Sequence, residues 1–91
     1  MKRAVAISKN DNVATLLDNV GAGEEIEVSG DISARVVARE AINRGHKISL
    51  REIDEGEDII KYGVVIGVST KRILEGHHVH THNVIGKRTG N

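Results

Sequence analysis

The sequence predicts a small, mainly β domain folded from compact, irregular hairpins, with one short helix near its N-terminus. Its 91 residues include eleven Ile and eleven Val, against four Leu and no Phe. β-Branched side chains lose rotamer freedom in a helix, so this composition favours strands. Short apolar runs alternate with glycine-containing turns, which is typical of strands joined by tight connections. The length suits one domain, expected over residues 1–85, followed by a flexible polar tail at residues 86–91.

The N-terminal helix is expected over residues 11–20. Asp11 or Asn12 can cap its first turn, and Gly21 can end it. Its apolar residues recur at helical spacing, at Val13, Leu16, Leu17 and Val20. One further helical turn is expected over residues 38–43. Strands are expected at residues 25–28, 32–37, 46–53, 59–62, 64–68 and 77–84.

A repeated pattern organises these strands: an aliphatic residue, two others, glycine, two others and a second aliphatic residue. It occurs at Val20-Gly23-Ile26, Ile42-Gly45-Ile48, Ile53-Gly56-Ile59 and Ile73-Gly76-Val79. Glycine adopts a positive φ at little steric cost, so each instance predicts a sharp turn that returns the second aliphatic residue to the core. Spacings of 22, 11 and 20 residues between the glycines are too uneven for a solenoid and favour a β-roll or β-clip.

Composition argues against several classes of partner. Thirteen Lys and Arg balance thirteen Asp and Glu, and Tyr62 is the sole aromatic residue, so no nucleic-acid surface is expected. No cysteine and no membrane-spanning run are present, and we expect a cytoplasmic protein that does not enter a membrane. Gly21-Ala22-Gly23 lacks the helix and lysine of a phosphate-binding loop, so no nucleotide cofactor is expected. A core of this size is marginal alone, which favours a homo-oligomer or hetero-oligomer.

The functional signal is a row of histidines near the C-terminus. Four of the five histidines lie within His77-His78-Val79-His80-Thr81-His82, and Asn83 follows. In an extended segment His78, His80 and His82 project from one face. Imidazole is the commonest protein metal ligand and titrates near neutral pH, so the row indicates metal binding, proton transfer or anion recognition. The alternative is an exposed polar face that binds nothing.

Three ordered motifs resemble the SAF domain, the β-clip module at the amino terminus of altronate and galactarate dehydratases. They are Gly45-His46-Lys47-Ile48-Ser49-Leu50, Ile60-Lys61-Tyr62-Gly63 with Ile66-Gly67 after it, and Glu75-Gly76-His77-His78-Val79-His80-Thr81-His82-Asn83. The likeness extends from about residue 11 to residue 84 and includes the small subunits of sulfolactate sulfo-lyase.

The resemblance implies a carbon-oxygen lyase that removes water from a sugar acid. The fused dehydratases continue into a large catalytic domain, whereas this sequence stops at Asn91. We therefore expect a small subunit that docks on a separate large catalytic dehydratase subunit. Two alternatives stay open: a small subunit of a sulfolactate sulfo-lyase-like enzyme, or a non-catalytic SAF binding or assembly module whose histidines are structural.

The resemblance also implies a divalent metal, iron or manganese, shared with the large subunit. His80 and His82, two residues apart on one strand face, are the expected metal ligands. His46, from another strand, is the expected third member, and all three are expected catalytic residues. Because the family signature includes His80 and His82, we assign no role to His77 or His78.

Three residues are expected to contact the sugar-acid substrate. Lys47 and Lys61 can neutralise its carboxylate, or a sulfonate. Asn83 can bind a substrate hydroxyl or orient a histidine ring. The alternative for each lysine is a solvated side chain over an apolar strand.

Overall fold

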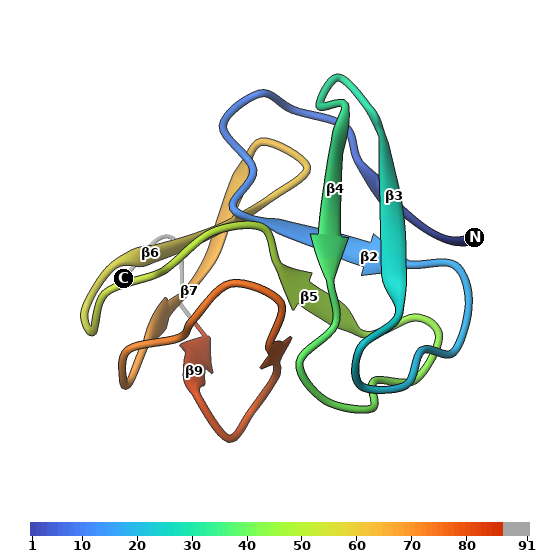
Figure 1. Ribbon diagram of the computed structural model, residues 1–91. Helices are drawn as coiled ribbons and strands as arrows, with labels where there is room; N and C mark the ends of the chain where they lie inside the picture. Colours follow the sequence, from blue (N-terminus) through green and yellow to red (C-terminus); the bar gives the residue numbers. More distant parts are fainter. Residues whose placement is uncertain (87–91) are drawn as a thin grey trace.

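The computed structural model describes residues 1–86. Gly86, where the expected tail begins, is the last residue of a strand, and the rest of that tail lies outside the described residues. Residues 1–86 contain nine strands and no helix, so the mainly β prediction is confirmed. The strands are β1 (Lys2–Ala6), β2 (Val13–Leu16), β3 (Glu25–Gly30), β4 (Ala34–Val37), β5 (Lys47–Ser49), β6 (Asp58–Lys61), β7 (Val64–Ser69), β8 (His78–Val79) and β9 (Val84–Gly86) (Figure 1).

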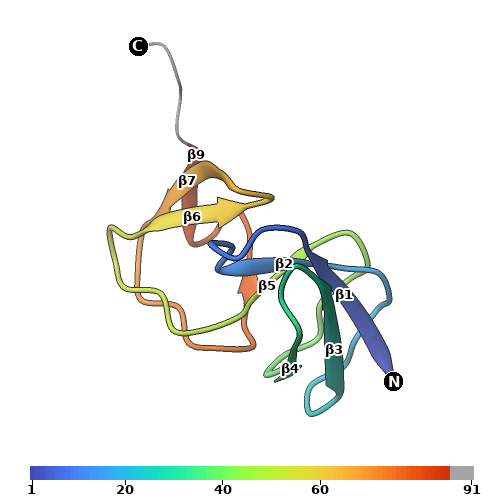
Figure 2. The same cartoon turned by 90° about the horizontal axis from the view of Figure 1, so that it is seen from above.

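Two sheets make up the fold. The six-stranded sheet has the order β4-β3-β1-β2-β5-β8, and the three-stranded sheet has the order β6-β7-β9. Neighbouring strands are antiparallel except for β1 and β3, which are parallel. Figure 2 shows β6, β7 and β9 at one end of the molecule, β3 and β4 at the other, and β2 and β5 between them. Over residues 1–86 no helix is available that could cross a membrane.

The expected helix over residues 11–20 is wrong, because this segment contains strand β2. β2 pairs on both sides, with β1 and with β5. Both of its faces are buried, since Ala14 and Leu16 pack in one hydrophobic cluster and Val13 packs in another. A strand with two buried faces carries apolar residues without strict alternation, so its pattern imitated helical spacing.

Other expectations for single elements are mixed. Each of the six expected strand segments overlaps an observed strand, whereas β1 was not expected. The expected helical turn over residues 38–43 is wrong. Ile42 in that segment instead forms a β-bridge with Val20, and such a bridge depends on a residue 22 positions away in the chain.

The four turns predicted from the glycine pattern are confirmed. Gly23, Gly45, Gly56 and Gly76 have φ values of 89°, 86°, 83° and 85°. We name the segments that contain them the first to fourth turn units, which are residues 20–26, 42–48, 53–59 and 73–79. The units associate in pairs, the first with the second through the Val20–Ile42 bridge and the third with the fourth through the Ile53–Ile73 bridge.

Two hydrophobic clusters position these units. The first lies on one face of the six-stranded sheet and consists of Ala4, Ala6, Ala14, Leu16, Val20, Ile26, Val28, Val36, Ala38, Ile42 and Ile48. The second consists of Val13, Ile53, Ile59, Ile73 and Val79. Because Val13 and Val79 belong to β2 and β8 while Ile59 belongs to β6, the second cluster packs the two sheets together. The β5–β8 pair therefore lies at the junction of the sheets.

Candidate functional site: a histidine cluster beside two lysines

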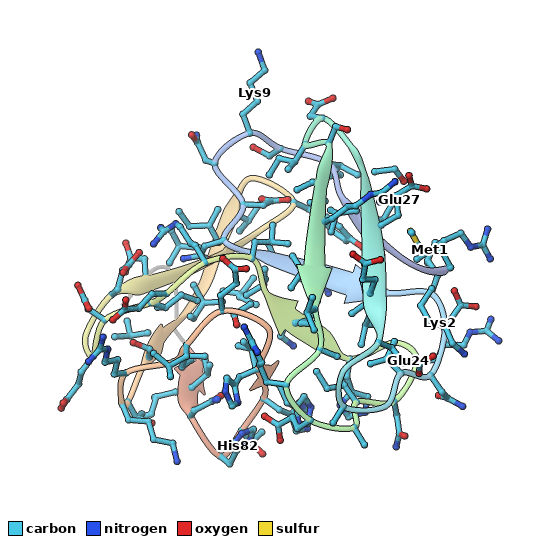
Figure 3. All side chains as sticks on the ribbon, in the orientation of Figure 1. Met1, Lys2, Lys9, Glu24, Glu27 and His82 are labelled. Carbon is cyan, nitrogen blue, oxygen red and sulfur yellow. The ribbon has the colours of Figure 1, made fainter. Side chains whose placement is uncertain are left out.

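The histidines meet at the antiparallel pair of β5 and β8. Ile48 lies opposite His78 and Lys47 opposite Val79, and the same register continued by one more residue brings His46 opposite His80. Ring centroids are 5.0 Å apart for His46 and His78, 4.8 Å for His46 and His80, and 5.4 Å for His78 and His80. The His82 ring lies 5.1 Å from that of His78, at the outer tip of the loop between β8 and β9 (Figure 3). The expected strand over residues 77–84 stops at Val79 and a turn follows, but the rings of His80 and His82 both lie next to the His78 ring.

Three of these rings form a compact group of nitrogen atoms, which we call the histidine trio: His46, His78 and His80. One ring nitrogen from each lies within 4.8 Å of the other two. His46 Nδ1 and His78 Nε2 are 2.9 Å apart, so the N–H of one ring donates a hydrogen bond to the nitrogen of the other. Three imidazole nitrogens suit a divalent transition metal that keeps open positions for substrate. The trio includes His78, to which the sequence analysis assigned no role; ligation by His82 stays a prediction.

The clustered imidazoles disfavour one another's protonation. Burial lowers the pKa of His78, and the charges that His46, His82 and His80 would carry lower it further. Desolvation also lowers the pKa of His80. The positive charges of His46, Lys47 and His82 lower it further, in that order of size. Both rings therefore favour the neutral form more than a free imidazole does, and the neutral form keeps a lone pair for a metal ion or for a proton.

Asn83 holds the turn that carries the histidines. It is buried, with 4% of its surface exposed. Its Oδ1 accepts a hydrogen bond from the His80 main-chain NH at 2.9 Å, and its Nδ2 donates to the His78 carbonyl at 2.8 Å. Both ends of the amide thus bind the main chain on either side of Val79. Substrate binding by Asn83 stays a prediction, and the observed contacts are those of a positioning residue.

Glu40 is a site residue that the sequence analysis missed. Its Oε2 accepts from the His78 main-chain NH at 3.1 Å and lies 3.0 Å from His77 Nδ1. Burial raises the pKa of Glu40, but the hydrogen bonds and the positive charges of the two histidines outweigh burial and hold this pKa below its ordinary value. No local sequence signal marks Glu40, because its partners lie 37 and 38 residues away.

Lys47 and Lys61 lie together on another side of the cluster. Lys47 is half-buried on β5, opposite Thr15 of β2. The Tyr62 hydroxyl donates to Thr15 Oγ1 at 3.0 Å, and Lys61 Nζ lies 5.1 Å from the centroid of the Tyr62 ring. Burial lowers the pKa of Lys47, and the positive charge of Lys61 lowers it further. The two predicted substrate-binding lysines are therefore close neighbours, whereas Asn83 stands apart from them in the turn between β8 and β9.

Two surface hollows flank the histidine cluster. One, of about 350 Å³, is lined by residues that include Glu40, Lys71, His77, His78 and His82. The other, of about 210 Å³, is lined by Lys47, His80, Thr81, Ile66, Val84 and Gly86. The cluster thus presents His78 and His82 to one hollow and His80 to the other.

Comparison with known proteins identifies relatives of two kinds. Altronate dehydratase of Bacillus subtilis (strain 168) is 39% identical over 83 residues, which are 91% of this chain but 16% of that protein. Altronate dehydratase of Escherichia coli (strain K12) is 39% identical over 79 residues, or 87% of this chain and 15% of that protein. The (2R)-sulfolactate sulfo-lyase subunit alpha of Chromohalobacter salexigens is 37% identical over 76 residues, which are 80% of this chain and 81% of that subunit.

The family with the description altronate/galactarate dehydratase SAF domain matches residues 2–87, which is nearly the whole chain. The three motifs from which the resemblance was drawn all lie within that range. The resemblance is confirmed, and the chain belongs to the SAF-domain family of altronate and galactarate dehydratases.

Proposed function

We propose that this chain is the small subunit of an altronate dehydratase-like lyase, and that it contributes the histidine trio to an active site shared with a large catalytic subunit. The observation that carries the proposal is the meeting of three ring nitrogens, from His46, His78 and His80, within 4.8 Å of one another. The trio lies beside two hollows, and the lowered pKa values of His78 and His80 favour the neutral rings that metal ligation requires.

The proposed reaction is the removal of water from a sugar acid. It requires loss of the proton beside the carboxylate, stabilisation of the resulting negative charge and protonation of the departing hydroxyl. A divalent metal such as iron or manganese, when held by the trio, would polarise the oxygens of the acid. In this proposal His82, which is exposed beside His78, would carry a proton to or from the bound acid. Asn83 and Glu40 hold the main chain of His78, so that the ring keeps its orientation.

The large partner is inferred from the relatives. The chain spans about a sixth of the altronate dehydratases that it matches, so most of the length of those proteins lies outside the matched region. The relatives of similar length are subunits alpha of sulfolactate sulfo-lyases, and the name subunit implies a second chain. The two hollows are open to solvent at the histidines, which leaves room for a partner to complete the site.

A metal titration of the full 91-residue chain tests the trio. We expect Mn²⁺ or anaerobic Fe²⁺ to bind with one ion per chain, and His78→Ala to weaken binding by at least about tenfold because one of three ligands is lost. His77→Ala is the matched control, because the His77 ring contacts Glu40 and lies outside the trio. Equal binding by both variants and the unaltered chain would contradict metal ligation by the trio.

Reconstitution with a candidate large subunit tests the shared site. We expect the mixture, and neither chain alone, to dehydrate altronate or galactarate, and we expect the His80→Ala/His82→Ala double variant to assemble but lose turnover. Equal turnover by the double variant would contradict a catalytic role for these histidines and would favour the alternative that the chain is a non-catalytic assembly module. The 81% coverage of the C. salexigens subunit favours a second candidate, in which the same site eliminates sulfite from sulfolactate. Assaying all three substrates in parallel separates the two lyases.

A further inference from the structure

The smaller hollow has a composition that suits an organic anion. Its polar lining comes from Lys47, His80 and Thr81, and its remaining side chains, Ile66 and Val84, are apolar. A volume of about 210 Å³ holds one end of a small acid but not a large cofactor. An apolar wall beside an ammonium group strengthens its attraction for an anion, because less water screens the charge.

Lys61, which does not line the hollow, adds a second positive charge near Lys47. It is linked to Lys47 through a chain of contacts, since Lys61 lies over the Tyr62 ring, the Tyr62 hydroxyl bonds Thr15, and Thr15 pairs with Lys47. Within residues 1–86 the ion pairs use Arg3, Arg51, Arg72 and His77 as cations, and neither lysine belongs to one. Burial lowers the pKa of Lys47 and the charge of Lys61 lowers it further, so the two ammonium groups repel each other, and a bound anion would relieve that repulsion.

We propose that the hollow lined by Lys47, His80 and Thr81 binds the oxyanion of the substrate acid, a carboxylate or a sulfonate, with Lys61 as the second cation. The proposal deepens the proposed function and rests on it for the identity of the acid. His80 belongs both to this hollow and to the histidine trio. An acid whose anionic end lies at Lys47 would then have its adjacent carbon and hydroxyl near His80 of the trio, which favours a hydroxy acid over a neutral sugar.

Anion binding can be measured without metal and without the partner. We would titrate the ¹⁵N-labelled full chain, in buffer freed of metal ions, with glycerate as the carboxylate and isethionate as the sulfonate. We expect saturable amide shifts at Lys47, Thr81 and Val84. Lys47→Met should weaken binding by about fivefold or more, the equivalent of roughly 1 kcal/mol, and Lys61→Met should weaken it by a smaller factor. Lys9→Met is the control, because Lys9 lies on an exposed loop far from His82 (Figure 3).

The outcomes separate this inference from the proposed function. Saturable binding that Lys47→Met weakens and Lys9→Met preserves supports the oxyanion site, and the tighter of the two ligands identifies it as a carboxylate or a sulfonate site. Shifts that do not saturate, that gather around Glu40 and Lys71, or that Lys47→Met leaves unchanged overturn it. His78→Ala removes a member of the trio outside this hollow, so it should weaken metal binding by at least about tenfold and keep glycerate binding. Loss of one property without the other shows which of the two proposals has failed.

Discussion

The third turn unit, residues 53–59, and the fourth, residues 73–79, repeat one hydrogen-bonding scheme. In each, the glycine NH donates to a serine carbonyl, and the NH of that serine donates to the carbonyl of the residue after the glycine. The participants are Gly56, Ser69 and Glu57 in the third unit, and Gly76, Ser49 and His77 in the fourth. The serine hydroxyls match as well, because Ser69 Oγ donates to the Asp54 carbonyl and Ser49 Oγ to the Leu74 carbonyl.

Each of these two units is also held by an asparagine. Asn12 donates to the Asp58 carbonyl at 2.8 Å and accepts from the Ile60 NH at 2.8 Å. Asn83 makes the same pair of bonds to residues 78 and 80 of the fourth unit and its strand. In both cases the amide bridges the second and fourth residues after the glycine. The hydrogen bonds that hold the histidine-bearing fourth unit are therefore the same as those that hold the third unit, which carries no histidine.

The units differ at the residue that follows the glycine. Glu57 accepts from the Asp54 NH at 3.0 Å and so closes its own turn. His77 takes that position in the fourth unit and contacts Glu40, outside the unit. The first and second units show the same difference at this position. Glu24, after Gly23, accepts from the Gly21 NH at 2.7 Å, whereas His46, after Gly45, contacts His78 outside its unit. A glutamate at this position completes a structural turn, and a histidine leaves its side chain available for a site.

The largest effect that separates the two units is expected from the glycines themselves. A Cβ at Gly76 would lie 2.2 Å from the Val37 carbonyl oxygen, whereas a Cβ at Gly56 meets nothing within 4 Å. Both positions have a positive φ, which costs an alanine about 1 kcal/mol. We expect Gly56→Ala to lose about that amount of unfolding free energy, and Gly76→Ala to lose about 3 kcal/mol or more because β4 must shift. Urea denaturation of the two variants measures both losses, and equal losses would show that the approach of Gly76 to β4 is not tight.

These glycines also show which features of the fold can be predicted from the sequence and which cannot. The strand-rich composition and the four turns were predictable because they follow from the preferences of single residues, namely β-branching and the positive φ of glycine. The close approach of Gly76 to Val37 was not, because nothing local distinguishes Gly76 from Gly56. The approach brings Glu40 to His77 and His78, so the sequence also left Glu40 unnoticed.

The candidate site was partly predictable for a similar reason. His80 and His82 were marked by their spacing on one strand, and His46 by the family motif. The membership of His78 in the trio depends on the register that places it opposite Ile48, and that register depends on pairing between distant strands. The error at residues 11–20 has the same origin, since two buried faces result from pairing with both β1 and β5.

The next largest effect should come from the asparagines. Asn12 and Asn83 are both buried, so replacing either by alanine leaves two main-chain groups without their partner. We expect Asn12→Ala and Asn83→Ala each to lower the free energy of unfolding by about 1–3 kcal/mol. Only Asn83→Ala should also weaken Mn²⁺ binding, by about tenfold, because only its turn orients His78 and His80. A similar loss of metal affinity in both variants would mean that general loosening, rather than orientation, controls the site.

A smaller effect is expected from the glutamates. Glu40 and Glu57 are partly exposed, so replacing either by glutamine should change the free energy of unfolding by less than about 1 kcal/mol. Glu40→Gln should lower Mn²⁺ affinity by about threefold, since the carboxylate that binds both His77 and the His78 main chain is weakened. Glu57→Gln serves as the control and should leave metal affinity unchanged. If both variants bind Mn²⁺ like the unaltered chain, Glu40 does not position the trio.

The smallest effect should be a local dependence on pH. The pKa values of His78 and His80 lie below the ordinary value of 6.5, so the unfolded chain binds more protons than the folded chain as the pH falls below that value. Their contribution to stability is complete above pH 6.5 and is lost on acidification towards the folded-state pKa values. The contribution of Glu40, whose pKa lies below its ordinary value of 4.5, is lost only at lower pH.

The units should therefore respond differently between pH 7.5 and pH 5.5. The His80 NH, bonded to Asn83, and the Ile60 NH, bonded to Asn12, occupy equivalent places in the two units. After correction for the intrinsic effect of pH on exchange, acidification should reduce the protection of the His80 amide against hydrogen exchange more than that of the Ile60 amide. A His78→Gln/His80→Gln variant should lose this difference because it has no imidazole to protonate at either position. Equal changes at both amides in the unaltered chain would mean that the pH response belongs to the whole domain and not to the histidine-bearing unit.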